Sequence, residues 1–224
     1  MEYFVFKGTR SDNLGIIVKE MPAISKSEKD IETIEVSGRN GAFHIDNGTY
    51  KTKKYKVKCV LKEDTYLDQI KLLFEGTGKL ELSTELNREY NATIQNQIDF
   101  SKYLTYLREF TLNFELDPIS YSKTATTKTI TENTSFTGGG NCNVNPKITI
   151  TGTGTVTLNN IPVEVTETGI TIDCELMNCT KNNLNKNDKV NIDSDFPYIK
   201  PGTNTVVLGT GVTSVSIEYN AGWL

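Results

Sequence analysis

Alternating hydrophobic and polar positions, which are typical of half-buried β-strands, run through most of this chain. The clearest run covers residues 54–62, where apolar side chains point to one face and lysines to the other: Tyr55, Val57, Cys59 and Leu61 against Lys54, Lys56, Lys58 and Lys62. A second long run covers residues 106–116, and its shared apolar face consists of Phe110, Leu112, Phe114 and Leu116. Both runs predict long strands with one buried face.

Shorter runs extend this β pattern over the rest of the first half. Strands are predicted over residues 4–7, 15–19, 31–36, 79–83 and 92–100. Two Gly- and Asn-containing segments, 38–41 and 46–48, predict turns of the kind that join hairpin strands.

One helix interrupts these strands. Leu67, Ile70 and Phe74 recur at helical spacing. Thr65 is a candidate N-cap, and Gly76 is expected to end the helix.

The second half contains only strand patterns. They cover residues 147–151, 155–158, 169–174, 188–192, 205–208 and 213–219. In the last run Val215, Ile217 and Tyr219 share one face. Short strands separated by Gly, Asn and Pro turns predict a β-sandwich or jelly roll.

The density of charge divides the 224 residues into two parts. Residues 1–118 hold 17 Lys+Arg and 19 Asp+Glu, whereas residues 119–224 hold only 7 and 9. Such a shift marks a domain boundary. We place it at Pro118, because proline is expected to end the preceding strand. Residues 121–137 are rich in Thr and lead into a Gly138–Gly140 run that predicts flexibility.

Composition excludes several classes of protein. A formal net charge of −4 disfavours a general nucleic-acid binder. No signal peptide or apolar stretch long enough to cross a bilayer is visible, so no membrane association is expected. Without an export signal, the four cysteines (Cys59, Cys142, Cys174 and Cys179) are expected to be free thiols.

A search for catalytic residues finds no convincing set. His44 is the one histidine, and its place between two turns favours a hairpin side chain over a catalytic base. Asp173 and Glu175 share one face of a predicted strand, whereas glycosidase carboxylates flank a sugar from opposite sides. We therefore predict that the protein is not an enzyme and has no catalytic, cofactor-binding or metal-binding residues.

Two surface features leave binding roles open. The lysine face could meet phosphate, although a solvated face explains it more simply. Four aromatic residues of the second half could stack on sugars: Phe136, Phe196, Tyr198 and Trp223. Core burial explains Phe196 and Trp223 more simply.

A series of short motifs follows one order along nearly the whole chain. In the first half they are residues 4–8, 15–18, Pro22, 36–41, 48–50, 76–78, 82–86, 90–92, 108–110, Phe114 and 118–121. In the second half they are residues 146–152, 170–173, Phe196-Pro197, 201–204, 217–219 and Trp223. In this order the motifs resemble the distal tail (Dit) proteins of siphophages that infect Gram-positive bacteria.

The resemblance implies a fold and an assembly. The fold would be mainly β, with a ring-forming N-terminal domain containing one helix (1–118) and a galectin-like C-terminal β-sandwich (119–224). The chain would form a homo-hexamer, in one ring or two stacked rings, that links the tail tube protein to the tail-associated or tail-fibre hub protein.

The resemblance also implies partners and a location. The sandwich would hold receptor-binding proteins, and DNA would pass through the ring without specific binding. The protein would lie at the tail tip or baseplate of the virion, after assembly in the host cytoplasm. The alternative is a carbohydrate-binding protein that recognises cell-wall sugars through the sandwich, and a glycoside-active enzyme ranks third.

Overall fold

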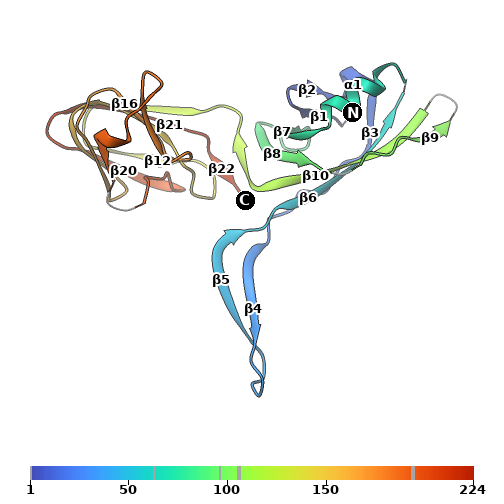
Figure 1. Cartoon of the computed structure of the whole chain (residues 1–224), viewed down its shortest axis with the longest axis horizontal. Helices are drawn as coiled ribbons and strands as arrows, with labels where there is room; N and C mark the ends of the chain where they lie inside the picture. The colour runs from blue at the N-terminus through green and yellow to red at the C-terminus, as the bar shows by residue number, and fades with distance from the viewer. Residues whose placement is uncertain (1, 63, 96, 105–106, 193–194) are drawn as a thin grey trace. The chain divides into compact units, whose positions relative to one another are not determined.

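A computed structural model describes residues 2–62, 64–95, 97–104, 107–192 and 195–224. The chain is mainly β and divides into two compact units, Met1–Ser120 with Leu224 and Tyr121–Trp223 (Figure 1). We call them the first unit and the second unit.

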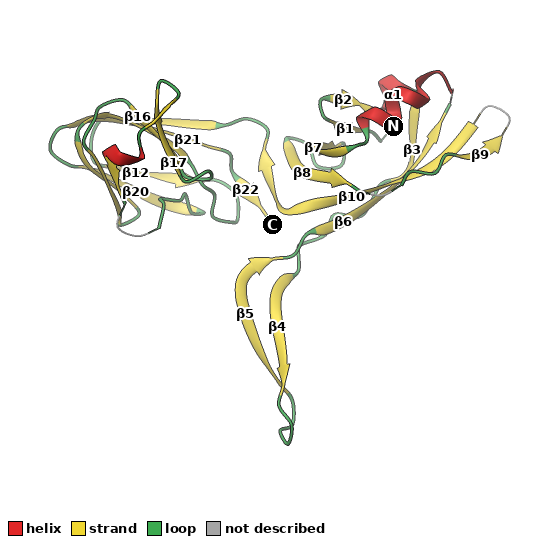
Figure 2. Cartoon of the chain, viewed as in Figure 1, coloured by secondary structure: helices red, strands yellow, loops and turns green. Residues whose placement is uncertain are grey.

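The first unit is built on one antiparallel sheet with the strand order β2-β1-β7-β8-β10-β6-β3, and β9 also pairs with β10 (Figure 2). Its strands are β1 (Phe4–Phe6), β2 (Thr9–Arg10), β3 (Ile16–Glu20), β6 (Lys53–Leu61), β7 (Gly76–Leu82), β8 (Arg88–Ile94), β9 (Ser101–Leu104) and β10 (Leu107–Ser122). A 3₁₀ turn, η1 (Ser11–Leu14), precedes β3. β4 (Lys29–Glu35) and β5 (Ala42–Tyr50) form a separate two-stranded sheet.

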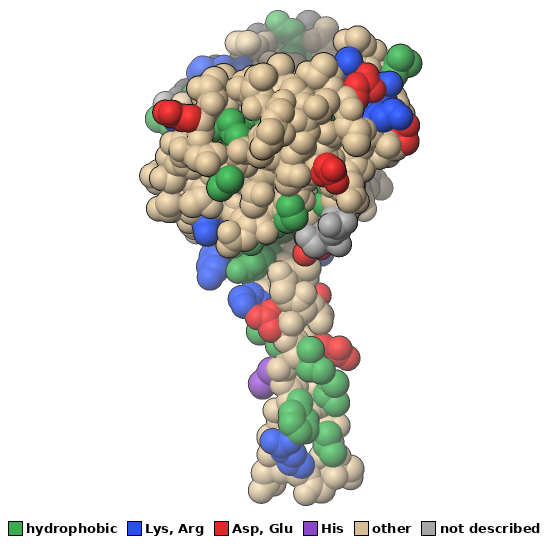
Figure 3. All heavy atoms as spheres, turned by 90° about the vertical axis from the view of Figure 1, so that its left-hand side faces the viewer, with side chains coloured by type: hydrophobic (Ala, Val, Ile, Leu, Met, Phe, Trp, Pro, Cys, Tyr) green, Lys and Arg blue, Asp and Glu red, His purple; other side chains and the backbone are tan. Residues whose placement is uncertain are grey.

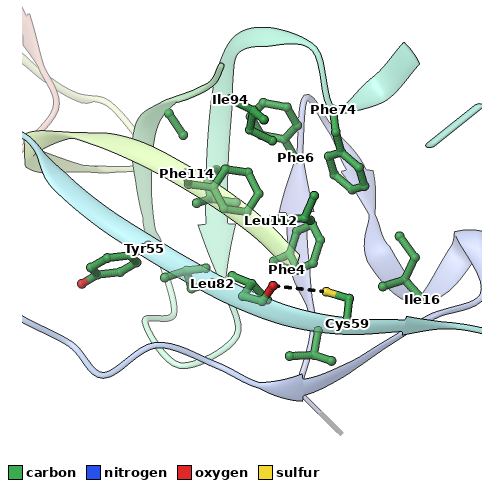
Figure 4. Close-up of a cluster of buried hydrophobic side chains, with 14 of the residues drawn as sticks. Phe4, Phe6, Ile16, Tyr55, Cys59, Phe74, Leu82, Ile94, Leu112 and Phe114 are labelled. Atoms are coloured by element: carbon green, nitrogen blue, oxygen red, sulfur yellow. Dashed lines mark hydrogen bonds between the residues drawn. The ribbon is translucent and has the colours of Figure 1, made fainter. Parts of the chain in front are cut away.

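The two long alternating runs form the centre of this sheet. β6 and β10 pair antiparallel, with Cys59 opposite Phe110 and Tyr55 opposite Phe114. The predicted apolar faces of both strands are buried, so both predictions are confirmed. Figure 4 shows this core, in which Phe114 lies against Phe4 and Phe6 with ring centroids 5.8 and 5.4 Å apart.

The helix begins one residue later than predicted. A 3₁₀ turn, η2 (Asp64–Tyr66), precedes α1 (Leu67–Leu73), and Tyr66 rather than Thr65 occupies the N-cap position, without a side-chain cap bond. The side chain of Thr65 lies outside the described residues. Phe74 is the C-cap of the helix. Gly76, which was expected to end the helix, is instead the first residue of β7 and takes a φ of +71°.

Two predicted breaks lie inside strands. β5 runs through residues 46–48, where Gly48 takes a φ of +73° and its N–H donates to the Asp46 carboxylate at 3.0 Å. β10 continues past Pro118, because its pairing with β6 ends at Leu116 and the missing proline N–H costs no bond of that ladder. Tyr106, the first residue of the predicted run, lies outside the described residues.

The second unit contains two sheets with one shared core. The first has the order β11-β21-β13-β16-β17-β18, and the second β12-β20-β14-β15-β19. The strands are β11 (Thr126–Ile130), β12 (Thr134–Gly138), β13 (Lys147–Gly152), β14 (Gly154–Leu158), β15 (Ile161–Val165), β16 (Ile170–Asp173), β17 (Asn178–Lys181), β18 (Leu184–Asn185), β19 (Val190–Asn191), β20 (Gly202–Leu208) and β21 (Val212–Tyr219). A 3₁₀ turn, η3 (Asn187–Lys189), precedes β19, and β22 (Gly222–Trp223) follows β21.

Side chains from both sheets form the core of the sandwich. Ile148, Ile172 and Ile217 come from the first sheet, and Val156 and Val206 come from the second. The predicted face of β21 is buried, because Val215, Ile217 and Tyr219 are at most 4% exposed. The mainly β fold with a C-terminal sandwich is therefore confirmed.

The threonine-rich stretch is structured and does not act as a linker. It contains β11 and β12, which lie at the edges of the two sheets. The glycines that follow are packed closely: a Cβ at Gly138 would lie 2.3 Å from the Lys200 carbonyl oxygen, and one at Gly140 would lie 2.1 Å from that of Gly222. The prediction of flexibility is wrong, because these positions need glycine for close packing.

A buried asparagine fixes the loop that leads into β20. Asn204 is fully buried, and its amide donates to the carbonyl oxygens of Lys200 and Gly202 at 2.9 and 3.0 Å. Its side-chain oxygen accepts the Lys200 N–H and the Asn159 amide. The bonds satisfy both ends of the buried amide, which explains the asparagine in this loop.

Trp223 lies in β22 and is half-buried. The strand is held to its own unit at Gly222, which bridges Gly140 and accepts the Asn141 N–H at 2.9 Å. The expectation of core burial is therefore too strong for Trp223. Phe196 is also half-buried, although it packs against the core.

Candidate functional site

The most unusual surface of the first unit is the hairpin of β4 and β5, which we call the arm (residues 29–50). Figure 1 shows it extending away from the main sheet of the unit. In its register Glu32 faces Ile45, and Ile34 faces Phe43. Directly opposed residues share one face of a hairpin, so these four side chains lie together.

The face that contains Ile34 is apolar and exposed. Ile34, Phe43 and Ile45 are 38%, 47% and 46% exposed, and Val36 continues the same alternation just beyond β4. We call these four side chains the apolar face of the arm. Figure 3 shows hydrophobic side chains gathered along the projecting hairpin. A contiguous exposed apolar surface on a soluble protein marks an interaction site.

The opposite face of the arm is polar. The hydroxyl group of Thr33 lies 3.2 Å from Nδ1 of His44, and Lys29 pairs with Asp46. Ile31 is the large apolar residue of this face and is 42% exposed. His44 is therefore an exposed hairpin residue, as the sequence predicted.

The turn at the tip holds one aromatic side chain in place. The connection covers residues 36–41 and includes the turn predicted at 38–41, where Gly38 and Gly41 take φ values of +85° and +83°. The guanidinium carbon of Arg39 lies 3.8 Å from the centroid of the Phe43 ring. This cation–π contact restricts the ring while leaving it exposed.

The base of the arm is tied to the main sheet. The Ser27 hydroxyl donates to the Pro118 carbonyl oxygen at 3.0 Å, and the Ser25 N–H donates to the Tyr55 hydroxyl at 3.3 Å. On the returning strand, the Thr52 hydroxyl donates to Glu115 at 2.9 Å. Both connections to the arm are therefore held by the core sheet.

A buried charged group lies next to this base. Lys53 is 7% exposed, and its ammonium lies 4.9 Å from the centroid of the Tyr90 ring. Burial lowers the pKa of Lys53, and the Glu85 carboxylate opposes that shift. The Tyr90 hydroxyl donates to Glu85 at 2.6 Å, and burial together with this bond raises the pKa of Tyr90.

The residues considered for catalysis have structural partners. The Asp173 carboxylate accepts the N–H groups of Glu175 and Leu176 and lies 3.4 Å from Lys147. This carboxylate shapes the turn after β16. His44 belongs to the other unit, on the arm.

All four cysteines are free thiols, as predicted. Burial raises the pKa of Cys59 and of Cys174 to about 12, which keeps both in the unreactive thiol form. Within the described parts of the chain, no group of three His, Cys, Asp or Glu side chains could hold a metal ion. Among the same residues, no helix is long and apolar enough to span a membrane.

The two binding surfaces considered from the sequence differ from the arm. The lysine face of β6 is solvent-exposed, and Lys58 pairs with Glu20 at 2.6 Å. The four aromatic residues of the second half are all half-buried, and the Phe136 ring lies 6.3 Å from that of Tyr219. Neither surface collects exposed apolar groups as the arm does.

Comparison with known proteins shows which family the second unit resembles. Residues 139–223 match the family described as siphovirus-type tail component, C-terminal domain. No curated protein sequence matches the chain. The second unit is thus similar to the C-terminal domain of siphovirus-type tail components.

A solved structure extends this likeness to the whole chain. The fold matches the crystal structure of the SPP1 Dit protein (gp 19.1), with a TM-score of 0.80, 17% sequence identity and 100% of each chain covered. That protein is described as a paradigm of the hub adsorption apparatus in phages infecting Gram-positive bacteria. The predicted resemblance is confirmed: residues 139–223 match a siphovirus-type tail component domain, and the whole chain has the fold of the SPP1 Dit protein.

Sequence reasoning located the arm but missed its importance. The alternation over residues 31–36 and the turn at 38–41 predicted a hairpin. The signal that could have found the site is the hydrophobic pair Phe43 and Ile45 on the returning strand, in phase with Ile34. Periodicity alone does not show whether the chain itself covers such a face.

Proposed function

We propose that this protein forms a six-fold ring at the distal end of a phage tail. The ring links the tail tube to the tail-tip hub protein, and the second unit carries receptor-binding proteins. The fold shared with the SPP1 Dit hub protein supports this role. One observation carries the proposal: the first unit presents an anchored arm whose apolar face is exposed.

The arm gives the ring a physical basis. Burying its four apolar side chains, each already about half covered, would contribute about 1 kcal/mol per side chain at each junction. A closed ring repeats the junction at every subunit, so small contributions add around the circle. The anchored base reduces the entropy lost when the arm binds a neighbour.

Location and partners follow from the same role. Assembly takes place in the host cytoplasm, which matches the four free thiols. The net charge of −4 suits a channel that lets DNA pass without holding it. None of these contacts requires a catalytic residue, a cofactor or a metal ion.

Native mass spectrometry and negative-stain electron microscopy over a range of protein concentrations test the proposal. We expect rings of six subunits, in single or stacked form, that bind purified tail tube or hub protein. A protein that stays monomeric at high concentration and binds neither partner would contradict the ring role.

A further inference from the structure

A groove beside the helix of the first unit has an apolar floor. The floor consists of Phe74, Ile94, Ile98 and Phe100, and the rim carries Lys71, Glu75 and Gln95. The groove has a volume of about 320 Å³, at the lower end of the range that holds a bound side chain or small ligand. It lies where the end of α1 meets the segment after β8.

Two side chains of the groove floor, Phe74 and Phe100, are held in place by contacts with the core of the first unit. The Phe100 ring lies 4.9 Å from that of Phe110, a buried residue of β10. Phe74 is buried against Phe4 and Phe6. The outer surfaces of Ile98 and Phe100 are half-exposed, so they offer apolar area without further rearrangement.

The geometry points to one occupant: we propose that the arm of a neighbouring copy binds in this groove, with Phe43 as its anchor. The proposal rests on the ring proposed above. A ring requires a head-to-tail contact between two different surfaces of the same chain. A contact between two arms would be two-fold and would end at a dimer, so the arm needs a different apolar surface as its partner.

The groove meets this requirement better than another hollow of the same unit. That hollow has a volume of about 490 Å³, but charged side chains line it, among them Lys56, Lys58, Asp99 and Glu109. Burying the apolar face of the arm against these charges would desolvate them without compensation. The apolar floor of the groove carries no such cost.

Charges around the two surfaces complement each other. Arg39, beside the Phe43 anchor, can meet Glu75 on the rim of the groove. Glu32, at the other end of the arm's apolar face, can meet Lys71. In Figure 1, α1 and the tip of the arm lie on opposite sides of the main sheet of the unit, so the arm does not reach its own groove.

Two complementary variants of the full chain test the junction. Phe43→Asp removes the anchor of the arm, and Ile98→Asp places a charge in the floor of the groove. Each variant alone is expected to be monomeric by analytical ultracentrifugation. Leu86→Asp is the matched control: Leu86 is 72% exposed, in the turn between β7 and β8, at the end of that hairpin away from the groove, and rings are expected to remain.

A mixture of the two monomeric variants gives the decisive result. The intact arm of the Ile98→Asp copy binds the intact groove of the Phe43→Asp copy, and the remaining arm and groove of that pair are both defective. The mixture is therefore expected to form one-to-one heterodimers and no rings. Thermal unfolding of each variant checks that the fold is kept.

The outcomes separate this inference from the proposed function. If the unmodified protein forms rings and Ile98→Asp forms them equally well, the groove is not the binding site, although the ring role stands. If folded Ile98→Asp is monomeric but the mixture gives no heterodimer, the pairing of arm and groove is overturned. If the unmodified chain forms no rings at any concentration, the proposed function itself is contradicted.

Discussion

Two regions of this chain, the closing strands β20 and β21 and the arm, follow the same alternating pattern and differ in what covers them. In β20 and β21, which belong to the two different sheets of the second unit, Val206, Val215 and Ile217 are at most 1% exposed, because the sheets face each other across them. In the arm, Ile34 and Phe43 hold equivalent in-phase positions and are 38% and 47% exposed. The closing strands complete a core, whereas the arm presents an apolar surface that a partner can cover.

The largest expected effect comes from breaking the apolar face of the arm. Ile34→Asp should abolish ring formation, because an uncompensated carboxylate would be buried at every junction. Ile31→Asp is the matched control on the same strand, since Ile31 is similarly exposed but lies on the polar face. Size-exclusion chromatography with light scattering measures both variants. Equal loss of assembly in the two would show that the face of the strand does not matter.

Truncating one isoleucine in each of these two regions sharpens the comparison. Ile217→Ala should destabilise the second unit by about 2–5 kcal/mol, because it leaves a cavity in a closed core. Ile45→Ala should change the stability of the monomer little and weaken the ring. Chemical denaturation of dilute monomer measures the first quantity, and the concentration dependence of assembly measures the second. A large loss of monomer stability in Ile45→Ala would mean that the chain itself covers the arm.

A smaller effect is expected at Trp223. Its side chain is half-buried, so Trp223→Ala should cost about 1–2 kcal/mol, below the range for fully buried tryptophan. Ring formation, which depends on the first unit, should be unchanged. Thermal unfolding followed by size-exclusion chromatography tests both statements. Loss of rings in a folded Trp223→Ala variant would contradict the separation of roles between the units.

The smallest effect concerns acid stability of the second unit. Glu167 accepts hydrogen bonds from Lys181 and Lys186 at 2.8 and 3.0 Å, and these bonds lower the pKa of its carboxyl to about 2. A lowered folded-state pKa stabilises the fold above the ordinary value of 4.5, and this contribution is lost as the pH falls from 4.5 to 2.

Glu167→Gln should therefore flatten the dependence of the unfolding midpoint on pH between 4.5 and 2. Glu164→Gln, at an exposed position on β15, is the control. Thermal unfolding across this pH range measures the difference. The same slope in the Glu167 variant and the unmodified protein would show that the two ion pairs contribute nothing.

Sequence patterns predicted much of the fold because strand periodicity reports which face is buried. The alternating faces of β6, β10 and β21 follow from residues such as Val57, Leu112 and Ile217. The continuation of β10 past Pro118 did not follow, because a proline is harmless where the neighbouring strand ends, and a single strand does not show where that happens.

The candidate site was harder to predict, because it depends on distant contacts. The base of the arm is fixed by pairs such as Ser27 with Pro118, which are 91 residues apart. Lys53 precedes the alternating run of residues 54–62, and nothing in the sequence predicted that it would be buried beside Tyr90. Phe43 is exposed because no part of the described chain outside the arm packs over it, and a local sequence pattern does not show this.

Hydrogen–deuterium exchange of the unmodified protein across its assembly transition tests the central claim most directly. If copies meet through the arm, amide exchange over residues 29–50 should slow as rings form, while exchange within the core strands of the second unit stays the same. Rings whose arm amides exchange as fast as those of the monomer would contradict the account.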